Sequence, residues 1–242
     1  MPSKSVEYLK SKYYTKSEHP YEVYERLVLS NLTSTTTVLD YGCGRTAPNL
    51  VRWKHAGRKL FGVDLIDFTV SDPDLTLIKT CLSEPNLTWT LPIASGSVDL
   101  ITARSVVEHL RDPRKVFTEL NRVLKPCGAI VFLTANFWDY GSLIAAVIPN
   151  SLHPKIVAKV EGRKENDTFP TEYRANTRGE IESISRNTGF KISEFEYLTQ
   201  YPNYLQFSAP LFAVGIAYER FTKNVRGMGF LRSWILCKLV KI

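Results

Sequence analysis

Two carboxylates and two glycines stand where strands of a sheet are expected to end. Asp40, Gly42 and Gly44 close a short apolar run, and Asp64 closes the next one, twenty residues after Gly44. Glycines at such a turn let the backbone approach a ligand because they carry no Cβ. A carboxylate at the next strand tip can accept hydrogen bonds from both hydroxyls of a ribose. The spacing therefore predicts a nucleoside site.

The residues around this turn discriminate between two kinds of nucleoside. A nicotinamide or flavin dinucleotide presents a pyrophosphate, which favours a third glycine and a free helix N-terminus. This chain has Thr46 where the third glycine would fall, and the acidic Asp40 immediately precedes the turn. An acid repels a pyrophosphate but attracts a positive charge. The charges favour a cationic nucleoside over the cofactor of a dehydrogenase.

The elements that must position these residues alternate between strand and helix. Apolar runs at residues 38–40, 60–64, 75–80, 98–102 and 129–134 predict five strands. Asp112 and Pro113 predict the start of a helix whose apolar face continues to Leu124, and Pro126 and Gly128 are expected to end it. Further along, residues 177–188 predict a helix and 190–198 a strand, while 234–240 fit a strand or a helix. Such alternation is typical of a parallel sheet covered on both faces.

Several of these segments together resemble the class I S-adenosylmethionine-dependent methyltransferases, in particular the small-molecule, methyltransferase type 11-like subset. The matching segments are residues 38–44 (VLDYGCG), 62–64 (GVD), 91–92 with 97–100, 107–113 (VEHLRDP), 119–120 and 122–128 (RVLKPCG). The resemblance implies an α/β, Rossmann-like, mostly parallel sheet of about seven strands with helices on both faces. It also implies a reversed last strand and a small helical elaboration.

The resemblance further implies roles in binding S-adenosyl-L-methionine. Gly42 and Gly44 should pass under its methionine and ribose parts, while Asp40 orders the loop and bonds the amino group. Asp64 should bind the ribose and Leu65 should pack near the adenine. Past the fourth strand, Ser105 and Val106 should line the same site.

Two departures from the family pattern bear on this site. Thr46 replaces the usual third glycine, which could shift the loop. The acidic residue that the family often has near the adenine is not visible, since Cys81 or Asn86 occupies the corresponding positions.

His109 is the candidate catalytic residue, because it stands just past the fourth strand, beside the expected position of the methyl group. A hydroxyl acceptor usually benefits from a general base, and histidine titrates in the right range. The competing interpretation is that His109, like Glu108, only supports the turn before Asp112 and Pro113. No cluster or spacing in the sequence suggests a metal site.

We expect one methyltransferase domain over residues 1–242. Within it, residues 1–34 would form an N-terminal helical lid, 35–135 the donor-binding core, and 136–176 and 199–232 the acceptor-side insertions. The predicted enzyme transfers a methyl group to a small-molecule acceptor, at an oxygen of a sugar, lipid-linked compound or other metabolite. Two alternatives stay open: a catalytically silent S-adenosylmethionine-binding partner protein, and a nucleic-acid methyltransferase.

Charge and cysteine content bear on partners and compartment. A net charge of +7 is too modest to indicate nucleic acid by itself, so no nucleic-acid partner is expected. The four cysteines show no metal-ligand or CxxC spacing, which favours reduced thiols in the cytoplasm. Neither a signal peptide nor a membrane-spanning stretch is visible.

A last feature is the apolar run at residues 204–218, which is followed by basic residues and no acidic residue after Glu219. Such a combination is typical of a peripheral membrane contact, here through residues 204–241. A helix buried in the domain and a homodimer contact are the alternatives.

Overall fold

The computed structural model describes residues 3–55, 58–80, 90–147 and 169–242. Its strands are β1 (Val38–Tyr41), β2 (Leu60–Asp64), β3 (Leu75–Lys79), β4 (Val98–Arg104), β5 (Leu124–Ala135), β6 (Phe190–Leu198) and β7 (Trp234–Lys241). Its α-helices are α1 (Lys4–Tyr13), α2 (Pro20–Leu29), α3 (Pro48–Arg52), α4 (Pro113–Val123), α5 (Tyr140–Val147), α7 (Arg178–Asn187) and α8 (Ala209–Asn224). Its short 3-10 helices are η1 (Lys16–Glu18), η2 (Val107–His109), η4 (Asn203–Leu205) and η5 (Met228–Leu231).

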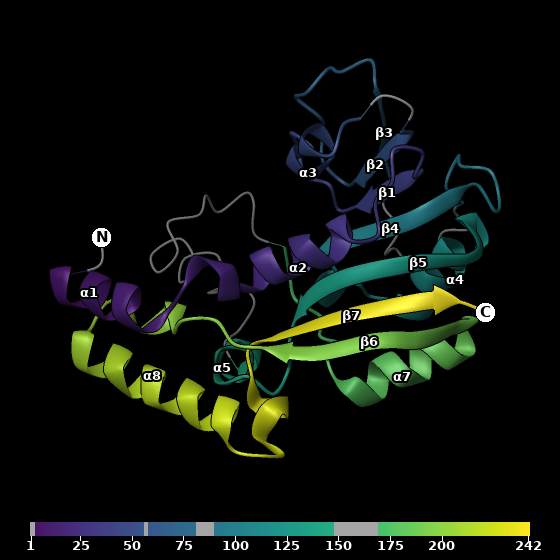
Figure 1. The fold of residues 1–242 in the computed structure, drawn as a ribbon. Helices are drawn as coiled ribbons and strands as arrows, with labels where there is room; N and C mark the ends of the chain where they lie inside the picture. Colours follow the sequence, from purple (N-terminus) through teal and green to yellow (C-terminus); the bar gives the residue numbers. More distant parts are fainter. Residues whose placement is uncertain (1–2, 56–57, 81–89, 148–168) are drawn as a thin grey trace. The chain divides into compact units, whose positions relative to one another are not determined.

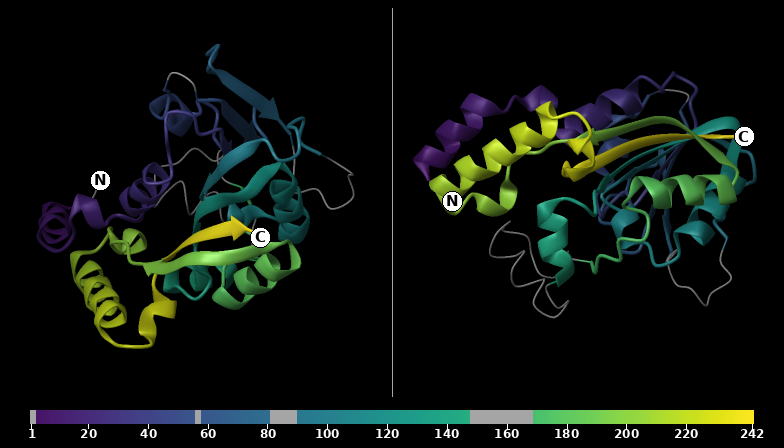
Figure 2. Two further views of the ribbon diagram at one scale, coloured as in Figure 1. Left: turned by 45° about the vertical axis from the view of Figure 1, so that its right-hand side comes forward. Right: turned by 90° about the horizontal axis from the view of Figure 1, so that it is seen from below.

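The strands form a seven-stranded sheet in the order β3-β2-β1-β4-β5-β7-β6. The pairs β1–β2, β2–β3, β1–β4 and β4–β5 are parallel. The last strand, β7, runs opposite to β6 (Figure 1). Figure 2 shows α4 and α7 together on one face of the sheet and α2 on the other. The predicted Rossmann-like fold with a reversed last strand is confirmed.

Local sequence explains where the helix before β5 begins and ends. Asp112 caps α4 by accepting a hydrogen bond from the Lys115 amide at 3.1 Å, and Pro113 occupies the first helical turn. The face of α4 turned to the sheet is apolar, and its Phe117 ring meets Phe132 and Phe190 edge to face. The expected strand at residues 129–134 was too short, because β5 begins at Leu124, directly after the helix.

The chain divides into two compact units. We call the first the sheet unit, which comprises residues 24–134, 172–195 and 236–242. We call the second the helical unit, which comprises residues 1–23, 135–171 and 196–235. The family-like segments all lie in the sheet unit. The predicted subdivision into lid, core and insertions stays a prediction.

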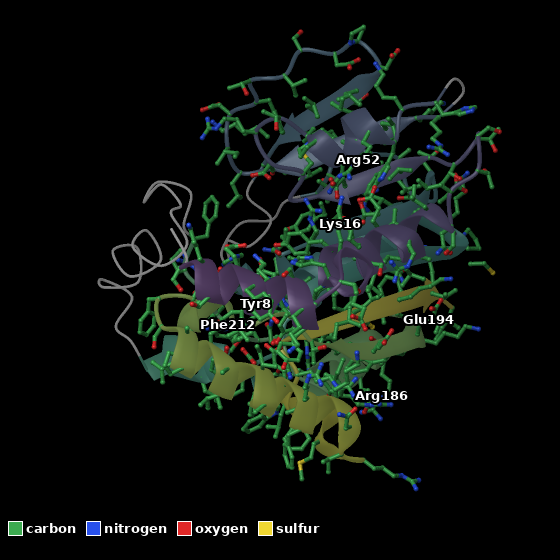
Figure 3. All side chains as sticks on the ribbon, turned by 60° about the vertical axis from the view of Figure 1, so that its left-hand side comes forward. Tyr8, Lys16, Arg52, Arg186, Glu194 and Phe212 are labelled. Atoms are coloured by element: carbon green, nitrogen blue, oxygen red, sulfur yellow. The ribbon has the colours of Figure 1, made fainter. Side chains whose placement is uncertain are left out.

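Within the helical unit, α1 packs along α8 (Figure 3). Val6 of α1 and Phe212 and Ile216 of α8 are buried together. Helix α8 approaches the segment before η4 closely, since a Cβ on Gly215 would lie 2.6 Å from the Pro202 side chain. The guanidinium of Arg232 donates to the carbonyls of Thr222, Lys223 and Tyr197 at 2.9–3.3 Å, which fixes the end of α8.

Among the helices that the structure describes, none has the length and apolar character needed to cross a bilayer.

Candidate functional site

The turn after β1 has two glycines in a left-handed backbone conformation. Gly42 and Gly44 have φ values of +76° and +77°, which only glycine adopts readily. The Gly42 amide donates to the Val63 carbonyl at 2.7 Å, so the turn is tied to β2. A Cβ on Gly42 would lie 2.1 Å from Val106 Cγ2, whereas a Cβ on Gly44 would meet nothing within 4 Å. Gly42 is therefore needed for packing, and Gly44 borders open space.

Asp64 holds the same turn from the tip of β2. Its Oδ2 accepts a hydrogen bond from the Gly44 amide at 2.7 Å, and its Oδ1 accepts from the amides of Leu65 at 2.7 Å and Ile66 at 3.3 Å. Each carboxylate oxygen has two lone pairs, so Oδ1 is fully engaged while Oδ2 keeps capacity for one further donor such as a ribose hydroxyl. The neighbouring Leu65 side chain is 40% exposed, as expected of an apolar side chain available to a ligand.

Asp40 is placed differently, because its carboxylate is buried under the turn. It accepts a hydrogen bond from Thr102 Oγ1 at 2.7 Å and one from Asn49 Nδ2 at 3.4 Å. Burial raises the pKa of Asp40 to about 6, although the hydrogen bonds from Thr102 and Asn49 oppose the increase. Asp40 thus joins β1 to β4 and α3 beneath the turn, and its expected role in donor binding stays a prediction.

The sheet brings the two carboxylates to neighbouring strand ends. In the parallel pair β1–β2, Asp40 is in register with Gly62 and Tyr41 with Val63, one residue before Asp64. The negative charge of Asp64 also raises the pKa of Asp40. Two carboxylates at neighbouring strand ends create a local field that stabilises a cation.

The carboxyl end of β4 lies next to that of β1 and adds the residues that follow it to the site. Ser105 has a φ of +57°, which is strained for a non-glycine residue, and its amide donates to the Leu133 carbonyl at 2.9 Å. This turn places Val106 against Gly42. His109, the candidate base, is the last residue of η2 and is half-buried, with its amide donating to the Val106 carbonyl at 2.9 Å.

Arg104, the last residue of β4, is a site neighbour that the sequence interpretation missed. Burial raises the pKa of both Asp40 and Tyr24, a fully buried residue of α2, and the positive charge of Arg104 opposes that rise. The strand run at residues 98–102 ended two residues before Arg104, so the pattern gave no sign that β4 continues to the edge of the site.

A buried hydrogen-bond chain behind η2 was also missed. Thr134 Oγ1 donates to Glu108 Oε2 at 2.7 Å, and Asn176 Nδ2 donates to Thr134 Oγ1 at 2.9 Å. The Glu108 carbonyl accepts from the amides of Glu172 at 2.7 Å and Tyr173 at 3.2 Å. This chain fixes η2, and with it His109, to β5 and to residues 172–176.

Comparison with known proteins finds relatives for part of the sheet unit. Residues 39–132 match the methyltransferase domain family. The chain is 30% identical over 115 residues to a Mycolicibacterium smegmatis protein described as an S-adenosylmethionine-dependent methyltransferase, covering 47% of this chain and 43% of that protein. It is 28% identical over 156 residues to 2-methyl-6-phytyl-1,4-hydroquinone methyltransferase of Synechocystis, covering 57% and 46%.

A solved structure agrees in fold. Geranyl diphosphate C-methyltransferase of Streptomyces coelicolor, crystallised with S-adenosyl-L-homocysteine, superposes with a TM-score of 0.54 at 16% identity over 92% of this chain and 77% of that one. Residues 39–132 therefore match a methyltransferase domain of the kind that uses S-adenosylmethionine, and the fold of the chain agrees with that match. The matches span less than half the length of the two curated relatives.

Some segments that carry the family resemblance stabilise this methyltransferase domain instead of lining its site. Glu119 of α4 accepts a hydrogen bond from the Leu91 amide at 2.6 Å and pairs with Arg122 at 2.6 Å. Arg122 in turn donates to the carbonyls of Leu91 and Ile93 at 3.0 Å. These residues brace α4 against the segment before β4.

The structure describes the first departure from the family pattern, at Thr46, but not the second, near the adenine. Thr46 is followed by Ala47 in the left-handed region, with a φ of 43°, and α3 begins at Pro48. The turn therefore reaches α3 without a third glycine. Cys81 and Asn86, the candidate positions near the adenine, lie outside the described residues.

The residues present at this site fit S-adenosyl-L-methionine. Two carboxylates suit a cationic ligand, open space adjoins Gly44, and an exposed leucine follows Asp64. In the described part of the chain, no group of three His, Cys, Asp or Glu side chains is arranged to hold a metal ion.

Proposed function

We propose that this protein transfers a methyl group from S-adenosyl-L-methionine to a small-molecule acceptor, at an oxygen of a sugar, a lipid-linked compound or another metabolite. The observation that carries the proposal is the arrangement of residues at the carboxyl ends of β1 and β2. There, the half-exposed Asp64 and the buried Asp40 flank the turn at Gly44, which borders open space.

Each residue of this edge has a proposed task in binding. Asp64 accepts hydrogen bonds from the ribose, and Leu65 packs near the adenine. Asp40 holds the turn through Thr102 and Asn49 and supplies negative charge for the methionine end. Ser105 and Val106 line the site past β4. Gly42 allows the turn and Val106 to lie in contact.

The bound donor supplies a methyl group already activated by its sulfonium. The protein therefore has to hold the acceptor at near-attack distance and exclude water, an effect that is worth up to about 7–11 kcal/mol. His109 has the proposed task of accepting the proton of an acceptor hydroxyl. The backbone of η2, which ends at His109, is held by the hydrogen bonds that join Glu108, Thr134 and Asn176.

The names of two similar proteins support a small molecule as the acceptor. The Synechocystis and Streptomyces coelicolor proteins are named for a hydroquinone and for geranyl diphosphate, both small molecules. Neither name specifies an oxygen acceptor for this chain. The choice of oxygen rests on the histidine, since a hydroxyl gains more from a base than a more nucleophilic atom does.

Calorimetry with S-adenosyl-L-homocysteine tests the donor site. Asp64→Ala should weaken binding by roughly tenfold to a hundredfold, because it removes charge-assisted hydrogen bonds. Asp67→Ala is the matched control, since Asp67 is an exposed carboxylate three residues away that pairs with Lys79. If the wild-type chain binds no S-adenosyl-L-homocysteine, the proposal is wrong.

Turnover tests the catalytic part separately. A screen of hydroxylated acceptors with radiolabelled donor should give a product, and His109→Ala should lower its rate without weakening donor binding. Unchanged turnover in His109→Ala would exclude it as the base. Donor binding without methylation of any acceptor would favour the alternative of a catalytically silent partner protein.

A further inference from the structure

A chain of polar contacts within the sheet unit leads from α2 through α3 to Asp40. Glu25 of α2 accepts a hydrogen bond from the Trp53 indole at 3.1 Å, and its other oxygen lies 3.3 Å from the Arg52 guanidinium. Arg52, labelled in Figure 3, donates to Asn49 Oδ1 at 3.1 Å. Asn49 Nδ2 in turn donates to Asp40 Oδ2 at 3.4 Å. These contacts connect an exposed guanidinium to a buried carboxyl group.

The amide of Asn49 can serve Asp40 in only one orientation. With Nδ2 toward Asp40 the amide donates a hydrogen bond, whereas the reverse orientation would place a second acceptor against a carboxylate. Arg52 selects the first orientation, because a guanidinium donates and never accepts. Glu25 holds that guanidinium by an ion pair. Asn49 is buried, so a reversed amide would leave both carbonyl and carboxylate without a donor.

The ionisation of Asp40 depends on this hydrogen bond. Burial raises the pKa of Asp40 to about 6, and the hydrogen bonds from Thr102 and Asn49 oppose the increase. The other titratable or charged groups that interact with Asp40 are Tyr24 of α2, Cys43 of the turn, Asp64 of β2 and Arg104 of β4. Burial raises the pKa of the tyrosine and of the cysteine, so both are neutral near pH 6.

We propose that Arg52 and Glu25 are positioning residues of the donor site, which orient the Asn49 amide so that Asp40 keeps the negative charge that a cationic donor requires. This inference rests on the proposed function, because that charge affects binding only if the site takes S-adenosyl-L-methionine. Glu25 precedes residues 39–132, so the ionisation of Asp40 depends on a helix outside the family match.

Carbon-13 NMR of the full chain, labelled at the aspartate carboxyl carbons, tests the positioning without any ligand. The Asp40 resonance is the one that disappears in Asp40→Asn. Its titration midpoint should rise by about half to one pH unit in Arg52→Met, because the amide is then free to turn away. Arg52→Lys keeps a donor and should restore part of the shift. An unchanged midpoint in Arg52→Met would overturn the proposal.

Two further variants separate positioning from the effect of charge. Glu25→Met removes a negative charge, which by itself would lower the midpoint, whereas loss of positioning should raise it. A fall in Glu25→Met would therefore overturn the positioning role of Glu25. Arg178→Met is the matched control for Arg52→Met, since Arg178 is similarly exposed and pairs with Glu182 at 2.8 Å on α7. It should leave the midpoint unchanged, and an equal shift would contradict the proposal.

Calorimetry with S-adenosyl-L-methionine then links the charge to binding. At pH 6, Arg52→Met should bind about twofold to fivefold more weakly than the wild type, because a smaller fraction of Asp40 is ionised. At pH 8 the two affinities should nearly coincide. An equal loss at both pH values would indicate a merely structural role and overturn the proposal. No binding by the wild type, with the NMR shifts present, would overturn the proposed function and with it the donor role of these residues.

Discussion

The sheet unit and the helical unit treat apolar side chains differently. Among the described residues, four large apolar side chains are exposed in the sheet unit, namely Leu29, Val51, Leu65 and Ile242. The smaller helical unit exposes eleven: Tyr8, Trp138, Leu143, Phe169, Tyr204, Phe207, Leu211, Val214, Phe221, Val225 and Phe230. Exposed apolar side chains are thus concentrated in the helical unit, which is the smaller of the two.

Buried carboxylates differ between the units as well. Both oxygens of Asp40 in the sheet unit are hydrogen-bonded. In the helical unit, Glu219 bonds Tyr14 through one oxygen, while its Oε1 is buried without a partner among the described residues. Burial and the nearby Asp139 raise the pKa of Glu219 to about 8. Among the described residues, each unit has one buried side-chain oxygen without a hydrogen-bond partner, Tyr24 Oη in the sheet unit and Glu219 Oε1 in the helical unit, so the contrast concerns carboxylates alone.

The largest effect should come from emptying the core of the helical unit. Phe212→Ala removes a fully buried ring packed on Val6 and Ile216, which should destabilise this unit by about 3–5 kcal/mol. Hydrogen exchange should show faster exchange in α1 and α8. If S-adenosyl-L-homocysteine affinity falls as strongly as it does in Asp64→Ala, the donor site depends on the helical unit and the contrast between the units fails.

Gly42→Ala should have the next largest effect, this time in the sheet unit. It combines a left-handed φ with a Cβ placed on Val106, so the free energy of unfolding should fall by about 2–4 kcal/mol in a denaturant titration. Gly44→Ala has the same φ but open space, and should lose only about 1–2 kcal/mol. Adding Val106→Ala should restore part of the loss in the Gly42 variant and none in the Gly44 variant.

The pH dependence of stability should reflect Glu219. Between its ordinary pKa of 4.5 and its folded pKa of about 8, the folded chain holds a proton that the unfolded chain has released. Stability should therefore fall as pH rises through this range, by at most about 1.4 kcal/mol per pH unit. Glu219→Gln should flatten this part of the curve in denaturant titrations at several pH values. An unchanged slope would mean that Glu219 ionises normally in the folded chain.

The smallest effect should come from the exposed pair of Lys223 and Glu18. Lys223→Gln should change the free energy of unfolding by less than about 0.5 kcal/mol, because solvent screens such pairs. Glu182→Gln is its counterpart in the sheet unit, where Glu182 pairs with Arg178 at 2.8 Å on α7. A loss in Lys223→Gln well above that in Glu182→Gln would give this pair a structural role in the helical unit.

Features set by local sequence were predictable. The glycine turn, the acid at the end of β2 and the cap at Asp112 each depend on residues close together in the chain, and the structure has the predicted turn, acid position and cap. Helix α7 is another example, because Thr177 and Glu180 form a capping box at its start. Parallel pairing then followed from the alternation of strands and helices.

Features that join distant segments were not predictable. Glu219 meets Tyr14 across 205 positions, and Asn176 meets Thr134 across 42. No periodicity or spacing marks such pairs, since each residue alone is as common in a surface loop as in a buried contact. The same reason hid Arg104 and the assembly of residues 1–23, 135–147 and 196–235 into one unit.

The guanidinium of Arg232 has a mechanical consequence. It donates to the carbonyls of Thr222 and Lys223 at one end of α8 and to that of Tyr197 in β6. These hydrogen bonds connect the end of the helix to the strand. A force that separates α8 from β6 must therefore break hydrogen bonds of the Arg232 guanidinium. An isolated peptide of residues 204–230 would lack this anchorage and would be a poor substitute for the intact chain.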